Sequence, residues 1–214
     1  MQEILPGVWH WAAPHHSLGG KPVSSYWIED GGVLIDPLVP AEAGVEWFGG
    51  RPTPPRAIVL SNRHHYRDSG AFRERFGCEV HVPASGAHAF ADHRPVIEYD
   101  YGQELPGGLR TIHVGALSPD EGGLVRAQSQ TLWLADTVVR GYDPPGQIGW
   151  VLETLMDDPP QTRRALLSAY ERLLAEVQFE HLLLAHGLPL VGDGRTELER
   201  LVAEGGRTAS EAFA

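Results

Sequence analysis

The sequence predicts a layered α/β fold, in which sheets are covered by helices. Strand-like runs fill the first third of the chain, and helical patterns dominate the last third. A short, wholly apolar run at residues 57–60 is typical of a strand that is covered on both faces. This order of elements favours an α/β sandwich over an all-α or all-β fold. The length of 214 residues suits one domain, and we predict a single domain over residues 1–214.

The first part of the chain alternates between strands and turns. Short apolar or alternating runs predict strands at residues 8–11, 25–29 and 33–36. Asp30-Gly31-Gly32 predicts a tight hairpin turn between the second and third of these runs. A polar loop follows the apolar run, and then a helix is expected over residues 69–76, ended by Gly77. Residues 78–82 predict the next strand.

The second part ends in helices. Strands are predicted at residues 109–114, 123–127, 131–135 and 181–185, and a closing helix at residues 196–203. Asp158 followed by two prolines predicts a helix start, because a carboxylate caps the first turn and proline fits it. An apolar stripe at helical spacing then indicates core packing, and it consists of Leu166, Leu167, Tyr170, Leu173, Leu174 and Val177.

Composition narrows the classes of partner. Acidic residues outnumber basic residues by 28 to 17, so the net charge of −11 disfavours nucleic acid and anionic membrane surfaces.

No run approaches the ~20 apolar residues of a membrane span. The N-terminus lacks the basic start and apolar run of a signal peptide, and Cys78 is the only cysteine, so no internal disulfide can form. We expect a cytoplasmic location and a small-molecule partner. The sequence does not fix the oligomeric state.

Polar residues follow three of the apolar runs. Residues 57–60 lead into Ser61-Asn62-Arg63-His64, residues 132–135 into Asp136, and residues 181–185 into His186-Gly187. In layered α/β proteins, the loops beyond the strand ends build the site. A histidine, an aspartate and a second histidine brought together there form a plausible metal constellation, since zinc accepts nitrogen and oxygen ligands.

The chain resembles the metallo-β-lactamase superfamily along nearly its whole length. The resemblance rests on Gly7-Val8-Trp9, Val33-Leu34-Ile35-Asp36-Pro37, the loop at residues 60–70, Leu134-Ala135-Asp136-Thr137 and Leu184-Ala185-His186-Gly187, taken in order. It implies a four-layer αββα sandwich with the site at one edge of the two sheets. In active members, it also implies metal-bound hydroxide that attacks an ester, thioester, lactam or phosphoester.

Most of the metal ligands that this resemblance implies are replaced. With Ser61 as the residue before the motif, Asn62 stands where the first histidine belongs and His64 where the second does. Tyr66 replaces the motif's aspartate, and Arg67 replaces its third histidine. Ala116 stands where a turn histidine is expected. His64, Asp136 and His186 remain, which leaves two ligands per metal where a catalytic zinc has three, so a dinuclear zinc site is not expected.

Arg67 is expected to supply part of the lost positive charge. We hypothesise that its guanidinium pairs with the Asp136 carboxylate, a bidentate contact that arginine makes well. A site without metal is one possibility. A single zinc, iron or manganese ion held by His64, Asp136 and His186, with or without Asp68 or Glu121, is the other.

Two functions follow from these alternatives. The first is a divergent hydrolase of an unknown small molecule, in which His64 or His186 acts as general base beside Asp136 and Arg67. The second is a metal-free, non-catalytic relative that binds a small ligand or a protein partner in the former cleft. His15 and His16 either face the site or lie in a surface loop, and the roles of His65 and Asp68 stay open.

Overall fold

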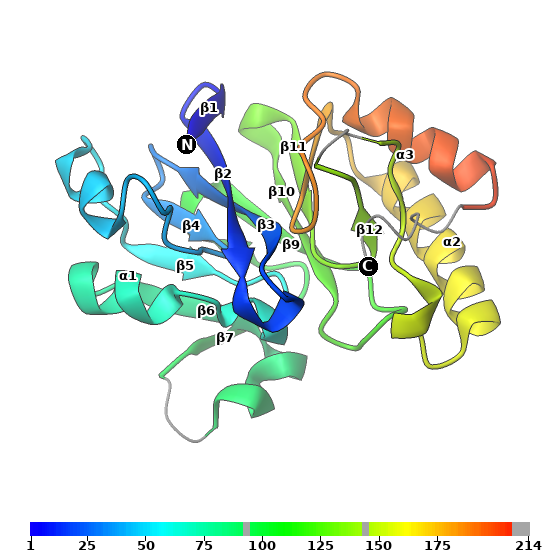
Figure 1. Cartoon of the computed structure of the whole chain (residues 1–214). Coiled ribbons are helices and arrows are strands. Elements are labelled where there is room, and N and C mark those ends of the chain that lie inside the picture. The colour runs from blue at the N-terminus through cyan, green and yellow to red at the C-terminus, as the bar shows by residue number, and fades with distance from the viewer. Residues whose placement is uncertain (92–94, 143–145, 207–214) are drawn as a thin grey trace.

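Two β-sheets lie face to face in the computed structural model, which describes residues 1–91, 95–142 and 146–206. The first sheet has seven strands in chain order, and the second has five strands in the order β14-β11-β10-β9-β8 (Figure 1). The strands of the first sheet are β1 (Gln2–Leu5), β2 (Val8–His15), β3 (Lys21–Ile28), β4 (Val33–Ile35), β5 (Ala57–Val59), β6 (Glu79–Pro83) and β7 (Ile97–Tyr99). Those of the second are β8 (Glu104–Leu105), β9 (Leu109–His113), β10 (Gly122–Arg126), β11 (Thr131–Leu134) and β14 (His181–Leu184).

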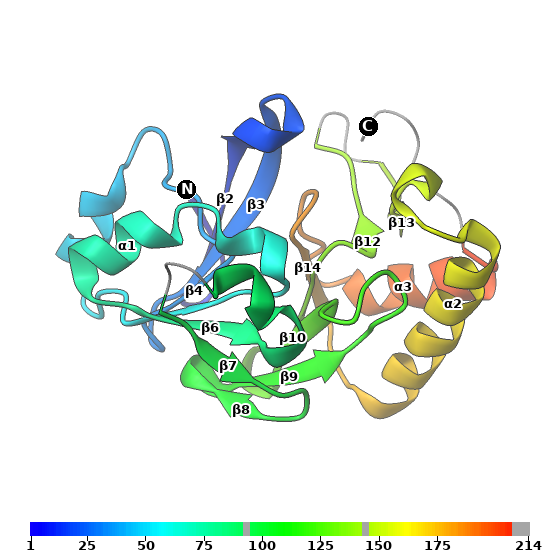
Figure 2. The ribbon, with the colours of Figure 1, turned by 90° about the horizontal axis from the view of Figure 1, so that it is seen from below.

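Helices cover the outer faces of both sheets. Helix α1 (Ser69–Phe76) lies beside the first sheet, and α2 (Pro159–Glu176) and α3 (Gly194–Ala203) lie beside the second. Figures 1 and 2 show α1 at one side, α2 and α3 at the other, and the strands between them. Two short strands, β12 (Val138–Val139) and β13 (Gly149–Trp150), form a small separate pair. Within the described ranges, no helix combines the length and the apolar character needed to cross a membrane.

The buried apolar residues form three clusters, one for each interface between layers. Leu34 and Ile58 belong to the cluster between the first sheet and α1, which includes Phe72. Their neighbours Val33, Ile35, Ala57 and Val59 belong to the cluster between the two sheets, together with Leu124, Trp133 and Leu183. The third cluster joins the other face of the second sheet to α2 and α3. Because side chains alternate along a strand, three such clusters require four layers, and the predicted αββα sandwich is confirmed.

Several predicted elements are confirmed with their local causes. Helix α1 spans residues 69–76 and ends at Gly77, whose left-handed backbone (φ 72°) lets its N–H bond the Arg73 carbonyl. The Asp158 carboxylate caps α2 by accepting a hydrogen bond from Gln161 N at 3.0 Å. The predicted strands do not include β1, β7, β8 and the pair β12–β13. None of these strands contains an apolar run of three residues, whereas the equally short β4, β5, β11 and β14 do.

Parallel pairing brings strand ends together where the loops of interest begin. Strand β4 pairs in parallel with β5 in the first sheet, and β11 pairs in parallel with β14 in the second. Asp36 directly follows β4, and Ser61 follows β5 by two residues. Asp136 and His186 each follow their strand by two residues. The carboxyl ends of these four strands therefore carry most of the polar residues that the sequence singles out.

Candidate metal and active site

Three side chains converge at the carboxyl ends of these strands. His65 Nε2 and His186 Nε2 each lie 3.0 Å from Asp136 Oδ1. One ligand atom from each of His65, Asp136 and His186 lies within 4.8 Å of the others. Asp136 and His186 thus come together, as expected for residues that follow neighbouring strand ends. The other histidine of the cluster is His65.

His64, the predicted partner, lies outside this cluster. Its side chain is exposed, and its backbone N–H bonds the Asn62 side chain at 2.9 Å. The cause is local: Asn62 caps a short 3-10 helix over Arg63–Tyr66. Successive side chains of such a helix point about 120° apart, so only one of two adjacent histidines faces the site. The cluster therefore contains the second of the two adjacent histidines, and His64 stays outside it.

His65 is buried and held in one orientation from behind. Its Nδ1 lies 3.0 Å from Asp36 Oδ2 and 2.9 Å from Ser61 Oγ. Asp36 is fixed in turn by Ser61, whose backbone N–H donates to Oδ1 at 2.8 Å and whose hydroxyl donates to Oδ2 at 2.5 Å. Asp36 is thus a brace for the His65 ring. A carboxylate behind one ring nitrogen leaves the other free as a metal ligand, which is a recurrent arrangement at metal sites.

Asp136 is anchored by residues on two sides. Asn62 Nδ2 donates to Asp136 Oδ2 at 2.8 Å. The backbone N–H groups of Asp136 and Thr137 donate to Glu121 Oε1 at 2.6 and 3.0 Å. Glu121 is fully covered, and it fixes the start of the loop that carries Asp136. The sequence raised Glu121 only as an optional ligand. In the structure, it binds backbone amides.

Arg67 does not form the predicted pair with Asp136. No ion pair between these two residues exists in the described structure, and Arg67 donates instead to three backbone carbonyls. They belong to Ser24 (2.5 Å), Asp36 (2.7 Å) and Ala185 (3.5 Å). A guanidinium carries five donors, and the strand ends offer the nearest acceptors. The ring nitrogens in contact with Asp136 belong to His65 and His186.

The optional ligand Asp68 and two residues of the neighbouring turn, Asp120 and Ala116, do not join the cluster. Asp68 Oδ2 accepts a hydrogen bond from Val39 N at 2.8 Å. Asp120 pairs with Arg63 and accepts the Ser118 hydroxyl at 2.9 Å. Ala116 lies in a turn with a positive φ of 62° and brings no ligand. These residues therefore shape loops around the cluster and do not enlarge it.

A hydroxyl network supports the turn that follows His186. The Ser24 hydroxyl donates to the Gly187 carbonyl at 2.7 Å and lies 2.9 Å from both His10 Nε2 and Tyr142 OH. Tyr142 OH accepts the Gly187 N–H at 3.0 Å. Gly187 has a φ of 130°, and a Cβ there would lie 2.2 Å from the Arg140 carbonyl oxygen, so only glycine fits.

Charge and burial set the protonation of the cluster. Burial alone would lower the pKa of His65, but the carboxylates of Asp136 and Asp36 outweigh it and raise this pKa to about 9. Burial would raise the pKa of Asp136, but His65 and His186 hold it well below its usual range. Burial, reinforced by the Asp136 charge, raises the pKa of Glu121 to about 8. At neutral pH, Glu121 is therefore largely protonated and Asp136 carries the negative charge.

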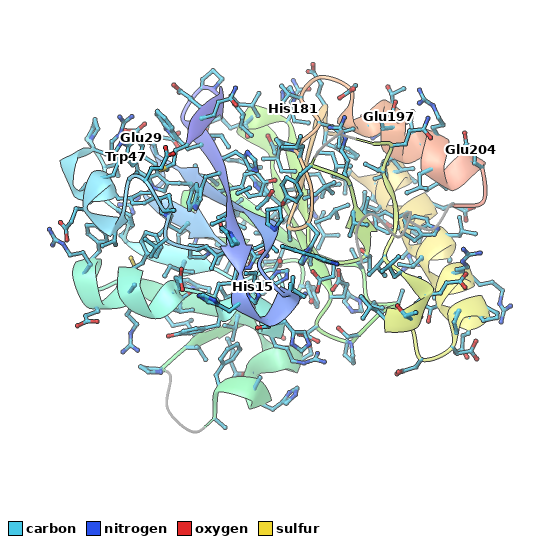
Figure 3. All side chains as sticks on the ribbon, in the orientation of Figure 1. His15, Glu29, Trp47, His181, Glu197 and Glu204 are labelled. Atoms are coloured by element: carbon cyan, nitrogen blue, oxygen red, sulfur yellow. The ribbon has the colours of Figure 1, made fainter. Side chains whose placement is uncertain are left out.

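His15 lies close enough to feel the same charges. Figure 3 labels it on the hairpin formed by β2 and β3. Burial lowers its pKa, and the positive charges of Arg67, His65 and His186 lower it further. His16 is exposed. Of the two histidines whose place the sequence left open, only His15 belongs to the surroundings of the site.

The cluster fits one metal ion by three criteria. Two imidazoles and a carboxylate are a donor set for zinc, and with open positions they also suit iron(II). The separation of 3.0 Å between donor atoms is close to the roughly 3.3 Å between ligands of a tetrahedral zinc. Asp136 Oδ1 is buried without a hydrogen bond, although both ring nitrogens are near, so these contacts lack hydrogen-bond direction. An ion held between the three ligand atoms would give this oxygen a partner.

Comparison with known proteins agrees with the fold. The model of the metallo-beta-lactamase superfamily matches residues 18–187. Solved structures with the same fold include a metallo-beta-lactamase family protein from Thermus thermophilus, with a TM-score of 0.65 and 19% identity over 94% of this chain and 80% of that one. A metallo-beta-lactamase from Erythrobacter litoralis has a TM-score of 0.65 and 14% identity over 95% of both chains. No curated protein matches by sequence.

Another similar structure is named as an oxidoreductase and not as a lactamase. The rubredoxin oxygen:oxidoreductase from Desulfovibrio gigas has a TM-score of 0.67 and 16% identity. The match covers 95% of this chain and 61% of that one, so the present chain spans about three fifths of the oxidoreductase. At these identities, the likeness concerns the fold alone. Function is therefore inferred from the geometry of the site.

Proposed function

Because the chain belongs to the metallo-β-lactamase superfamily, we propose that it is a hydrolase that binds one divalent metal ion through His65, Asp136 and His186. The observation that carries the proposal is the convergence of three ligand atoms within 4.8 Å at the carboxyl ends of the strands. His65 and Asp136 are both oriented by other side chains, as metal ligands are in proteins. Zinc, iron and manganese are the candidate ions.

Each residue of the site has a defined task under this proposal. Asp36 and Ser61 hold the His65 ring so that Nε2 faces Asp136. Asn62 holds Asp136 Oδ2, which leaves Oδ1 directed at the two histidines. The bound metal supplies a Lewis acid and a water of lowered pKa. Asp136 and His186 are partly exposed, so one side of the cluster is open to a substrate.

One ion, and not two, agrees with the remaining residues. Tyr66 and Arg67 occupy the positions where the resemblance places two further ligands, and Arg67 is a permanent cation. Its guanidinium lies among the carbonyls of Ser24, Asp36 and Ala185, next to the cluster. A second divalent ion there would meet a positive charge in place of a ligand.

The substrate we propose is a small molecule with an ester, thioester, lactam or phosphoester bond. Bonds of this class are those whose hydrolysis a metal held by His65, Asp136 and His186 would assist. The net charge of −11 disfavours a nucleic-acid substrate. Iron is tested beside zinc and manganese because two imidazoles and a carboxylate also suit iron(II).

The test combines metal analysis with turnover. Protein purified without a histidine tag is analysed for metal, and we expect about one ion per chain after incubation with zinc, iron or manganese. A panel of ester, thioester, lactam and phosphodiester substrates is then assayed with each metal. We expect His186→Ala to abolish turnover and His181→Ala, at the opposite end of β14, to retain it. Protein that binds none of the three metals would contradict the proposal.

A metal-free relative that binds a small ligand or a protein partner is the second candidate, and the charge balance favours it. Asp36 and Asp136 are matched by a protonated His65 and by Arg67 when no ion is bound. Such a cluster is electrically balanced, so a metal must displace the His65 proton to enter. Metal analysis separates the two candidates, because only the hydrolase requires an ion.

A further inference from the structure

Arg67 has a backbone conformation that its surroundings must enforce. It follows the 3-10 helix with φ 43° and ψ −123°, a region that residues other than glycine rarely adopt. Such conformations persist only where neighbouring structure over-determines them, and they concentrate at functional sites. The Arg67 side chain is partly buried, and its Nε is covered without a hydrogen bond. The strained backbone aims the guanidinium between the two sheets.

The guanidinium joins three strand ends from both sheets. Nη1 donates to Ser24 O in β3 at 2.5 Å and to Asp36 O after β4 at 2.7 Å. Nη2 reaches Ala185 O, after β14, at 3.5 Å. Ser24 N also donates to Ala185 O at 2.9 Å, so the same carbonyl is held from two sides. Arg67 thus closes the seam between the first sheet and the edge of the second.

Two of these carbonyls belong to residues next to the proposed ligands. The side chain of Asp36 orients His65. Ala185 directly precedes His186. A shift of either carbonyl would therefore move an imidazole relative to Asp136. The separation of 3.0 Å between each Nε2 and Asp136 Oδ1 depends on both backbones staying in place.

We propose that Arg67 is a positioning residue for the metal site, and that its guanidinium sets the spacing of His65 and His186 from Asp136 by holding the Asp36 and Ala185 carbonyls. This inference rests on the proposed one-metal function. Under this inference, the Arg67 guanidinium connects the two sheets through hydrogen bonds next to the metal ion. The charge of Arg67 also keeps a second divalent ion away from this position.

The experiment measures the affinity for zinc alone, by equilibrium dialysis against the full chain. Arg67→Ala and Arg67→Gly both remove the guanidinium, and only glycine relieves the backbone strain at positive φ. We expect both variants to bind zinc about 10- to 100-fold more weakly than the wild type, as for other groups that orient ligands. We expect Arg67→Gly to be the more stable of the two.

Arg67→Lys and a matched arginine provide the controls. Lysine keeps the charge and loses the planar fork, so we expect about a tenfold loss of zinc affinity. Arg126 is also buried and donates to a carbonyl, that of Gly107, at 2.9 Å, but it lies at the far end of β10. Arg126→Lys should lower stability and leave zinc affinity unchanged. In cobalt-substituted protein, we expect the visible absorption bands to change in Arg67→Lys and to stay unchanged in Arg126→Lys.

The outcomes separate this inference from the proposed function. If zinc affinity recovers in Arg67→Gly together with stability, Arg67 supports only the fold and the inference is overturned. If the wild type binds zinc and all Arg67 variants bind it equally well, the inference fails and the proposed function stands. If the wild type binds no zinc, iron or manganese, the proposed function fails and this inference fails with it.

Discussion

The charged groups on the outer side of the first sheet and those at the strand ends where the two sheets meet differ in how they are paired. On its outer side, Arg51 lies between Trp9 and Trp47, with its guanidinium carbon 4.7 and 4.8 Å from the two ring centres. It also forms two hydrogen bonds with Glu29, at 3.0 and 2.9 Å. We call Trp9, Trp47, Arg51 and Glu29 the indole cluster. Figure 3 labels Glu29 and Trp47 close together in this region.

The metal cluster of His65, Asp136 and His186 shows the opposite character. It lies where strand ends meet, and Asp136 Oδ1 and the nearby Arg67 Nε are covered without a hydrogen bond. Native proteins pair nearly all buried polar groups, so atoms left unpaired call for an explanation. The indole cluster satisfies its charges internally, which is typical of packing. The metal cluster balances its charges but leaves the buried Asp136 Oδ1 without a hydrogen bond, as expected of a place for a ligand.

The largest effect is expected from the two adjacent histidines. His65→Ala should weaken zinc binding by more than about 100-fold, because it removes one of only three protein ligands. His64→Ala should change it less than about twofold, because that side chain is exposed and outside the cluster. Equilibrium dialysis of the untagged protein measures both. A strong loss in His64→Ala with little loss in His65→Ala would restore His64 as the ligand that the sequence predicted.

His64 and His65 also show what could not be predicted from the sequence. The strands that carry Asp136 and His186 were recognisable, because short apolar runs followed by single polar residues mark strand ends. The choice between His64 and His65 depends on a loop that curls into a 3-10 helix. Asn62 was an available signal, since asparagine is a strong helix cap and its side chain does cap this turn.

Arg67 and Glu121 show a second limit of prediction from the sequence. The sequence indicated that they lie near the cluster, but it did not indicate which groups they bind. Both were expected near the cluster, yet Arg67 binds carbonyls and Glu121 binds amides. Backbone groups are present at every position and leave no trace in the sequence. The pairing of a side chain with a backbone atom therefore cannot be read from residue types, whereas the α1 boundaries could be, because Gly77 marks its end.

A smaller effect is expected from pH. In the metal-free protein, the pKa of His65 is about 9, so the ring is protonated at neutral pH and must lose a proton to bind metal. Zinc affinity should therefore rise about tenfold per pH unit between pH 7 and 9 and level off above that. The stability that this raised pKa gives the metal-free fold runs the other way. It is fully present below the ordinary value of 6.5 and is lost as pH rises through 9.

Glu121 is the control for this pH dependence, because its pKa of about 8 falls within the same window. Glu121→Gln removes that titration and should leave the slope due to His65. Asp36→Asn removes one of the two carboxylates that raise the His65 pKa, so the rise in affinity should move to lower pH. A wild-type affinity that stays flat from pH 7 to 9 would show that His65 is already neutral or is not a ligand.

The smallest effect on metal binding is expected in the indole cluster. Trp47 packs against Trp9, Trp27 and Phe48, with ring centres 5.1, 5.7 and 5.2 Å away. Trp47→Ala should lower the free energy of unfolding by about 2 kcal/mol, less than a fully buried tryptophan because the ring is only half-buried. Trp47→Phe should recover part of this loss. Zinc affinity should stay within about twofold in both variants, since the indole cluster contributes no ligand.

Urea denaturation and zinc dialysis on the same samples check the two quantities. A loss of zinc affinity that followed the loss of stability would mean that the two regions are coupled through the first sheet, and that pairing of charges does not separate packing from binding in this protein.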